Sequence, residues 1–200
     1  GDLAVILYTS GTTGKIKGVA LSHENLRSNA RSAASLHELS REDWSLAVLP
    51  LSHSYGLTVM NAGNILGTRG VLLRWLNPEE VLTTIQKFRI RSMSCVPTML
   101  VYLLNYPGAE QFDTSSMIYW GSGAAPLPLE IVEPFEKKFG GRILEGYGLT
   151  EATTVVSAHR LSMERRLGSV GKPIPGVEVK ILDDQDRELP AGAVGEICVR

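Results

Sequence analysis

Residues 3–18 read Leu3-Ala4-Val5-Ile6-Leu7-Tyr8, followed at once by Thr9-Ser10-Gly11-Thr12-Thr13-Gly14-Lys15-Ile16-Lys17-Gly18. The apolar run predicts a buried strand, and the polar residues after it predict a loop. Glycines let backbone N–H groups turn toward one point, hydroxyls donate hydrogen bonds, and lysines add positive charge, so the loop is suited to a polyphosphate. It is not a Walker A loop, which needs glycine in place of Thr9 and Ser or Thr in place of Ile16. An ordinary surface loop is the simpler alternative.

Length and composition set bounds on the class of protein. The chain has 200 residues, of which 44% are hydrophobic, enough to bury a core of one domain or slightly more. A net charge of −1 predicts no nucleic-acid partner and no anionic membrane surface. Cys95 and Cys198 are expected as free thiols in a reducing cytosol, with a disulfide as the alternative. No apolar stretch reaches the roughly 18 residues of a transmembrane segment, so we expect a cytoplasmic protein.

Strand-like and helix-like segments alternate as far as residue 146. Short apolar strands separated by helices predict an α/β fold with a largely parallel sheet and helices on both faces. Ser22 is expected to cap a helix that runs to about Leu39. The other expected helices are 55–66, 78–88, 97–105 and 129–139, and the expected strands are 3–9, 46–49, 70–74, 92–96, 117–120 and 142–145.

The pattern changes after about residue 157. Residues 177–182 alternate between apolar and polar, residues 183–188 form a polar turn, and residues 194–199 predict a second strand. This small β-rich segment, expected to be an antiparallel hairpin, is joined through the Gly- and Pro-rich stretch 168–176. We therefore expect two subdomains, 1–157 and 158–200. Both ends stop abruptly at strands, which predicts that the remainder of the same polypeptide lies on either side.

A second motif is Glu145-Gly146-Tyr147-Gly148-Leu149-Thr150-Glu151. Its glycines flank a ring that can stack on a base, and Thr150 can hydrogen-bond a phosphate oxygen. Glu151 is a hard oxygen ligand suited to Mg²⁺ that bridges phosphates. The alternative is a loop with one packed tyrosine and a solvated carboxylate.

Two further stretches follow predicted strands. Gly121-Ser122-Gly123-Ala124-Ala125-Pro126-Leu127 fails the dinucleotide fingerprint by one residue, yet its small side chains let a flat ring approach the backbone. A tight strand-to-helix turn is the alternative. Pro50-Leu51-Ser52-His53-Ser54-Tyr55-Gly56-Leu57 contains a histidine at a strand end, where a structural histidine is the commoner outcome.

Together these motifs resemble the adenylate-forming superfamily, which includes acyl-CoA synthetases, coumarate-CoA ligases, luciferases and peptide-synthetase adenylation domains. Residues 8–19 match its signature Tyr-Thr-Ser-Gly-Thr-Thr-Gly-x-Pro-Lys-Gly-Val except at Ile16, where the family usually has proline. Residues 145–151 match Tyr-Gly-x-Thr-Glu, and Glu145-Gly146 resembles the acyl-CoA synthetase branch. The four motifs occur in the family's order over nearly the whole chain.

The resemblance implies a ligase that uses ATP, Mg²⁺ and coenzyme A to activate a carboxylic acid, such as a fatty acid, through acyl-AMP. It implies catalytic roles for Lys17, His53, Thr150 and Glu151, with Glu151 on the metal. Lys17 and residues 9–13 would hold the β- and γ-phosphates, Thr150 the α-phosphate, and Tyr147 and residues 123–125 the adenine. The remaining implied nucleotide contacts are Gly14, Glu145, Gly146 and Gly148, while His53 and Tyr55 would wall the carboxylate site.

The resemblance also implies missing parts. The family's ribose-binding Asp and the catalytic lysine of its mobile C-terminal domain would follow Arg200, and a substantial segment would precede Gly1. The isolated chain is therefore expected to be inactive. Two alternatives stay open: an adenylation domain that serves a carrier protein or luciferase-like chemistry, and a catalytically silent nucleotide-binding module. Retention of Lys17 and Glu151 argues against the silent module.

Overall fold

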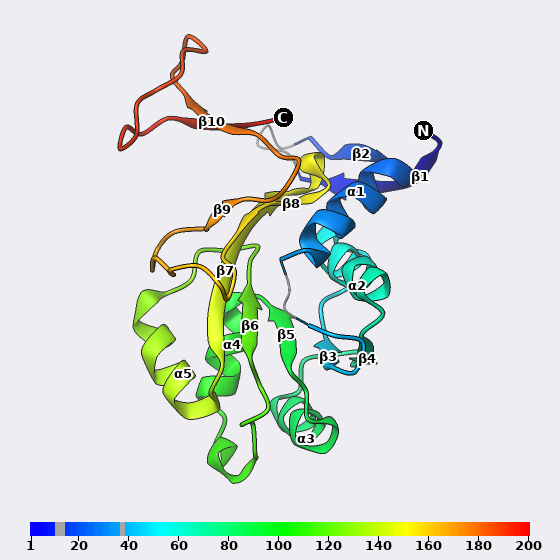
Figure 1. Cartoon of the computed structure of the whole chain (residues 1–200), viewed down its shortest axis with the longest axis vertical. Coiled ribbons are helices and arrows are strands. Elements are labelled where there is room, and N and C mark those ends of the chain that lie inside the picture. Colours follow the sequence, from blue (N-terminus) through cyan, green and yellow to red (C-terminus); the bar gives the residue numbers. More distant parts are fainter. Residues whose placement is uncertain (11–14, 37–38) are drawn as a thin grey trace.

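A seven-stranded sheet organises the molecule. The computed structural model describes residues 1–10, 15–36 and 39–200. Neighbouring strands lie in the order β4-β3-β5-β6-β7-β8-β9, and the first five run parallel (Figure 1). The prediction of an α/β fold with a largely parallel sheet is confirmed. The strands are β3 (Trp44–Ala47), β4 (Arg69–Leu72), β5 (Ser92–Cys95), β6 (Tyr119–Ser122), β7 (Arg142–Leu149), β8 (Thr154–Ala158) and β9 (Lys172–Pro173).

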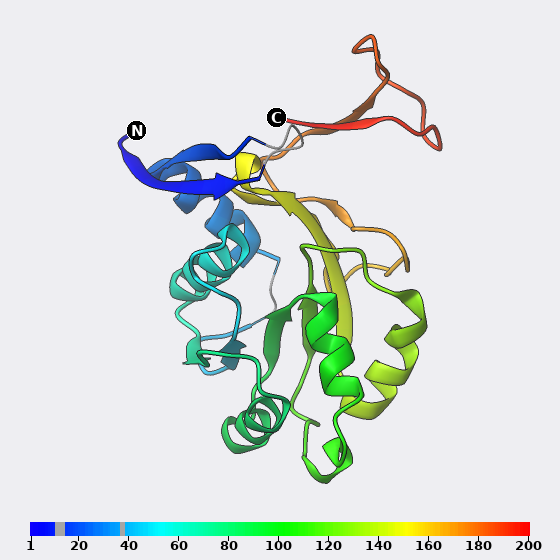
Figure 2. The same cartoon turned by 180° about the vertical axis from the view of Figure 1, so that it is seen from behind.

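Helices cover both faces of this sheet. The helices α3 (Pro78–Phe88), α4 (Pro97–Leu104) and α5 (Val132–Phe139) share the larger core with the parallel strands. On the other face, α1 (His23–Ala34) packs on α2 (Ser54–Leu66), and both contact β8 (Figures 1 and 2). Short 3₁₀ helices are η1 (Ala109–Gln111), η2 (Leu129–Ile131) and η3 (Thr150–Ala152). Within the described residues, every helix is too short or too polar to span a bilayer.

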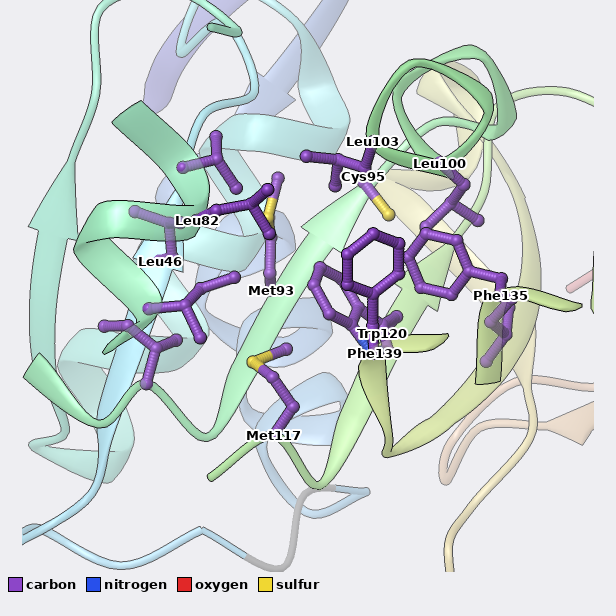
Figure 3. Packing of buried hydrophobic residues seen from close by; sticks show 14 of the residues in the cluster. Leu46, Leu82, Met93, Cys95, Leu100, Leu103, Met117, Trp120, Phe135 and Phe139 are labelled. Carbon is purple, nitrogen blue, oxygen red and sulfur yellow. The ribbon is translucent and has the colours of Figure 1, made fainter. Parts of the chain in front are cut away.

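The larger core is built around an aromatic cluster. Trp120 of β6 meets Phe135 of α5 edge-on at a centroid distance of 4.9 Å, and Phe139 lies 4.8 Å from Phe135 (Figure 3). The Trp120 indole N–H donates to the Gly140 carbonyl at 3.0 Å, so its one polar group is satisfied. Met93 and other buried residues of β3 and β5 continue this core toward α3. This packing fixes the parallel strands, and with them the loops at their carboxyl ends.

Local signals explain where the helices begin. Ser22 caps α1, as the sequence predicted: its side chain accepts from the Asn25 N–H at 3.1 Å. The Asn25 side chain also accepts from the Ser22 N–H at 2.9 Å, which completes a capping box. Helix α3 has Asn77 as its cap and Pro78 at its first position, and its predicted bounds are those observed. Helix α1 ends at Ala34 rather than near Leu39. Its last two residues, Ala33 and Ala34, are buried in a small cluster with Ala62 of α2, and such packing supplies most helix stability.

The first strand departs from the prediction. Strand β1 (Leu3–Thr9) does not join the parallel sheet but pairs antiparallel with β2 (Lys17–Ser22), which the sequence analysis missed. The reason is the length of the connection: residues 10–16 suffice for a hairpin, whereas a parallel crossover needs a dozen or more residues. The hairpin sets Lys17 directly opposite Thr9.

The chain from residue 146 onward also differs in part from the prediction. The second motif is not a loop: residues 146–149 extend β7 and pair antiparallel with β8. The stretch 168–176 contains the short strand β9, which adds to the same sheet as β8. The predicted antiparallel hairpin is confirmed as β10 (Val179–Leu182) and β11 (Glu196–Val199), which extends away from the rest of the molecule (Figures 1 and 2).

Candidate active site

A cavity of about 240 Å³ lies where the parallel strands end. Its walls come from segments that follow β3 and β6, from the end of β7 and from β8. Strand order reverses between β3 and β5, and crevices at the carboxyl ends of strands beside such a reversal are the usual ligand sites of α/β sheets. The predicted site residues that line the cavity are His53, Tyr55, Gly123, Ala124, Gly146, Tyr147, Gly148 and Thr150.

The inner wall of the cavity is mostly apolar. Val59 and Ala62 of α2, together with Leu144 of β7, contribute aliphatic surface. The Tyr55 phenol bonds to the Ser94 side chain, and burial raises the pKa of this phenol well above its usual value, so it stays protonated. Such a wall suits the apolar body of a small organic acid.

His53 stands at the edge of the cavity. It caps α2, and its ring Nδ1 accepts from the Tyr55 N–H at 3.1 Å. In the neutral ring the proton therefore sits on Nε2, which is left free to donate. This placement is compatible with a contact to a carboxylate oxygen, the role that the resemblance implies.

Thr9, the last residue of β1, contacts the second motif. The Thr9 Oγ1 donates to Glu151 Oε1 at 3.4 Å, across 142 positions of sequence. Lys17 is the ladder partner of Thr9, so the two side chains share one face of the β1–β2 hairpin. The β1–β2 hairpin thus brings a hydroxyl to a carboxylate of η3, with a lysine on the same face of the hairpin as the hydroxyl.

Thr150 has a neighbour that sequence reasoning missed. Its Oγ1 lies 3.2 Å from the Oγ of Ser54, a buried residue at the start of α2. Ser54 belongs to a motif that the sequence analysis quoted, but only His53 and Tyr55 were singled out there. The contact orients the Thr150 hydroxyl at the cavity wall.

The segment after β6 approaches the cavity closely. A Cβ added at Gly123 would lie 3.4 Å from the Tyr55 ring, so the backbone here is packed against that side chain. Ala124 has a φ of 68°, a left-handed conformation that is unfavourable for alanine. Strain of this kind is commonly held at functional sites. Tyr147 of the neighbouring strand β7 lines the same cavity as Gly123 and Ala124, as a joint contact with a flat ring would require.

Other predicted residues lie elsewhere. Ser10 follows β1 and is exposed, and Gly11, Thr12, Thr13 and Gly14 fall outside the described residues. The Glu145 carboxylate accepts backbone hydrogen bonds from Leu127 and Gly168; burial raises its pKa, partly opposed by those bonds and by Arg165. Glu145 and Ala125 are not among the described residues that line the cavity.

His159 is a cavity residue without an assigned role in the sequence analysis. It is 4% exposed; its Nε2 accepts from the Arg166 N–H at 3.3 Å and its Nδ1 lies 3.3 Å from the Glu145 carbonyl. Burial lowers the pKa of this ring, and Arg165 and Arg142 lower it further against the opposing effect of the carbonyl. The ring is therefore held neutral, with its proton on Nδ1.

Because the pKa of His159 is lower in the folded chain than in the unfolded chain, the unfolded chain takes up the proton first on acidification. We expect the free energy of unfolding to fall from about pH 7.5 to about pH 5.5, and His159→Gln to reduce this dependence. Urea denaturation at both pH values measures it. The exposed His23→Gln serves as the matched control, and an equal pH dependence in wild type and His159→Gln would contradict the assignment.

Glu151, which lies beside Thr9 and is not among the described residues that line the cavity, suits one kind of metal site. Among the described residues, no group of three or more His, Cys, Asp or Glu side chains could hold an ion by itself. Glu151 is an exposed carboxylate beside Thr9. Mg²⁺ usually takes one or two carboxylates and completes its shell with substrate phosphates and water, so a single Glu151 suits an ion that arrives with a nucleotide.

Comparisons with known proteins define the class. The sequence model of the family described as AMP-binding enzyme matches residues 1–200, the whole chain. The chain therefore belongs to the AMP-binding enzyme family of adenylate-forming proteins, as its motifs indicated.

Particular relatives cover the chain completely or nearly so. It is 38% identical over 203 residues to the long-chain-fatty-acid–CoA ligase of Bacillus subtilis (strain 168), covering 100% of this chain and 36% of that ligase. ATP-bound MatB of Rhodopseudomonas palustris superposes with a TM-score of 0.90 and 34% identity, over 100% of this chain and 39% of that one. The ATP and magnesium complex of Bacillus subtilis O-succinylbenzoate coenzyme A synthetase superposes with a TM-score of 0.83 and 33% identity. The match covers 98% of this chain and 40% of that one. The chain thus spans little more than a third of these relatives.

Proposed function

We propose that the protein containing this chain activates a carboxylic acid with ATP, forming acyl-AMP and pyrophosphate. The observation that carries the proposal is that the Thr9 hydroxyl, which has Lys17 as its ladder partner, contacts Glu151, and that Thr150, the residue before Glu151, lines an apolar-walled cavity. One oxygen of the acid attacks the α-phosphorus, and the bond from that phosphorus to the bridging oxygen of pyrophosphate breaks. Because a carboxylate must approach a phosphorus surrounded by anionic oxygens, the reaction needs positive charge and hydrogen-bond donors held in place beforehand.

Each part of the site has a chemical task in this proposal. Lys17 and Thr9 bind the departing phosphates from the β1–β2 hairpin, and Thr150, oriented by Ser54, donates to an α-phosphate oxygen. Tyr147, Gly123 and Ala124, which line the cavity, hold the adenine. Glu151 would hold Mg²⁺, which when bound neutralises phosphate charge. His53 donates from Nε2 to the carboxylate of the acid.

The second half-reaction is proposed from the relatives rather than from contacts in this chain. Both the Bacillus subtilis fatty-acid ligase and the O-succinylbenzoate synthetase are named as coenzyme A enzymes. We therefore infer transfer of the acyl group from acyl-AMP to the thiol of coenzyme A, with release of AMP. The apolar wall formed by Val59, Ala62 and Leu144 favours an acid with an apolar body, a fatty acid among them. A cytoplasmic location stays an expectation from the sequence.

A Glu151→Gln substitution tests the metal assignment and, with it, the site. A neutral amide is a poor ligand for a hard dication, so we expect the Mg²⁺ concentration for half-maximal ATP–pyrophosphate exchange to rise about tenfold in the full-length protein. The acid used in this measurement is one that supports exchange in the wild-type protein, chosen from a panel of carboxylic acids. Glu110→Gln, an exposed glutamate in η1, is the matched control. An unchanged Mg²⁺ titration with full activity would remove Glu151 from the metal site.

A further inference from the structure

The turn that follows Glu151 has a backbone conformation that its residues disfavour. Thr153 and Thr154 have φ values of 62° and 102°, in the left-handed region. Threonine is β-branched, and such residues are rare there because the side chain crowds the backbone. Conformations of this kind persist only where the surrounding structure enforces them. The turn that carries Thr150 and Glu151 into the site therefore needs contacts that hold it.

Asn29 of α1 supplies the first of these contacts. Its Nδ2 donates to the Val155 carbonyl at 2.8 Å, and its Oδ1 accepts from the Val155 N–H at 3.2 Å. The residue is 7% exposed, so these bonds are made away from water. A side-chain amide that satisfies both backbone groups of one residue fixes its position and its rotation together. Asn29 therefore anchors β8 directly after the strained pair.

Thr58 of α2 supplies the second contact. Its hydroxyl lies 3.2 Å from the Thr154 Oγ1 and 3.4 Å from the Thr153 carbonyl oxygen, and the residue is 3% exposed. The Thr153 N–H in turn donates to the Thr150 carbonyl at 3.0 Å. The strained pair is thus tied to one helix by Thr58 and to the catalytic segment by its own backbone.

We propose that Asn29 and Thr58 are positioning residues for adenylation, an inference that rests on the proposed function. They hold the turn 150–154 in its strained form, so that the Thr150 hydroxyl faces Ser54 and the Glu151 carboxylate faces Thr9. Asn29 gives the cleaner test. Thr58 also lines the cavity, whereas Asn29 does not. Asn29 lines a second hollow of about 500 Å³ between α1, η3 and β11, and Glu151 and Thr153 of the turn line that hollow too.

The test replaces Asn29 with leucine, which has a similar volume and no hydrogen-bonding group, in the full-length protein. We expect ATP–pyrophosphate exchange to fall about tenfold and the half-saturating Mg²⁺ concentration to rise several-fold, while the KM for the acid is unchanged. Glycine adopts a φ of 62° without strain, so Thr153→Gly in the same protein is expected to restore both values to within about threefold. A role in stability alone predicts neither the Mg²⁺ shift nor the rescue.

Asn105→Leu is the matched control, because Asn105 bonds to Val101 of α4 on the other face of the sheet. We expect it to leave the Mg²⁺ titration unchanged. If Asn29→Leu does not fold, Thr58→Val gives the same test, with the buried Thr84→Val of α3 as its control. A folded Asn29→Leu variant with an unchanged Mg²⁺ titration, or a defect that Thr153→Gly does not relieve, would overturn the proposal.

A second readout separates this inference from the proposed function. If the wild-type protein shows no ATP–pyrophosphate exchange with any acid of the panel, the proposed function fails. The hold of Asn29 on the turn 150–154 can still be measured by hydrogen exchange. Amide protons of residues 151–155 are expected to exchange faster in Asn29→Leu than in wild type, and to be unaffected in Asn105→Leu. Equal exchange rates in wild type and Asn29→Leu would show that Asn29 does not hold the turn.

Discussion

Gly148→Ala is expected to destabilise the fold by about 3 kcal/mol or more, the range of a severe core defect. A Cβ on residue 148 would lie 1.5 Å from the Thr154 carbonyl oxygen and 2.5 Å from its carbonyl carbon. Both are backbone atoms in the strand paired with β7, so no side chain can move aside. Relief requires β7 and β8 to separate at the irregular pairing beside Tyr147, and the separation would also displace Thr150. Urea denaturation of the two proteins measures the loss.

Gly70→Ala is the matched control for this prediction. Gly70 lies in the edge strand β4, where the nearest atom to an added Cβ is the Ser45 Oγ at 4.0 Å. Alanine is a slightly better strand residue than glycine, so this variant should be as stable as wild type. Equal stability of Gly148→Ala and wild type would mean that the close approach of β7 and β8 is not required in solution.

Lys17→Ala is expected to slow adenylation by about 10- to 150-fold, which corresponds to about 1.5–3 kcal/mol for one charge-assisted donor. Lys17 faces the same side of the hairpin as Thr9, whose hydroxyl reaches Glu151, and this is where the departing pyrophosphate would leave. Transfer of the acyl group from synthetic acyl-AMP does not involve those phosphates. In the full-length protein, ATP–pyrophosphate exchange should therefore fall much more than thioester formation from acyl-AMP.

Lys15→Ala removes the same charge two positions away and serves as the control. Lys15 is exposed and lies in the connection before β2, where we expect a solvated charge. Its loss should change pyrophosphate exchange by less than about twofold, as for a surface charge. If Lys17→Ala lowers both half-reactions equally, the lysine does not act on the departing phosphates.

Much of the parallel part of the fold could be predicted from the sequence because its signals are local. Pro78 after Asn77 marks the start of α3, and the apolar strands near 46, 93 and 119 were placed within about two residues, the usual error of such boundaries. The chemical character of the site could also be predicted from short stretches of sequence. Hydroxyls, glycines and a lysine in residues 9–18, and a tyrosine, threonine and glutamate in residues 145–151, indicate phosphate, base and metal ligands without reference to the fold.

What the tertiary structure alone decided is which of these residues meet. Thr9 and Glu151 are 142 positions apart, and no local pattern reports their contact. The antiparallel pairing of β1 depends on a partner strand, and the contacts of Ser54, Asn29 and Thr58 depend on how α1 and α2 lie on the β7–β8 hairpin. Local propensity and motif chemistry belong to short stretches of chain, whereas strain, burial and convergence arise only when distant stretches pack together.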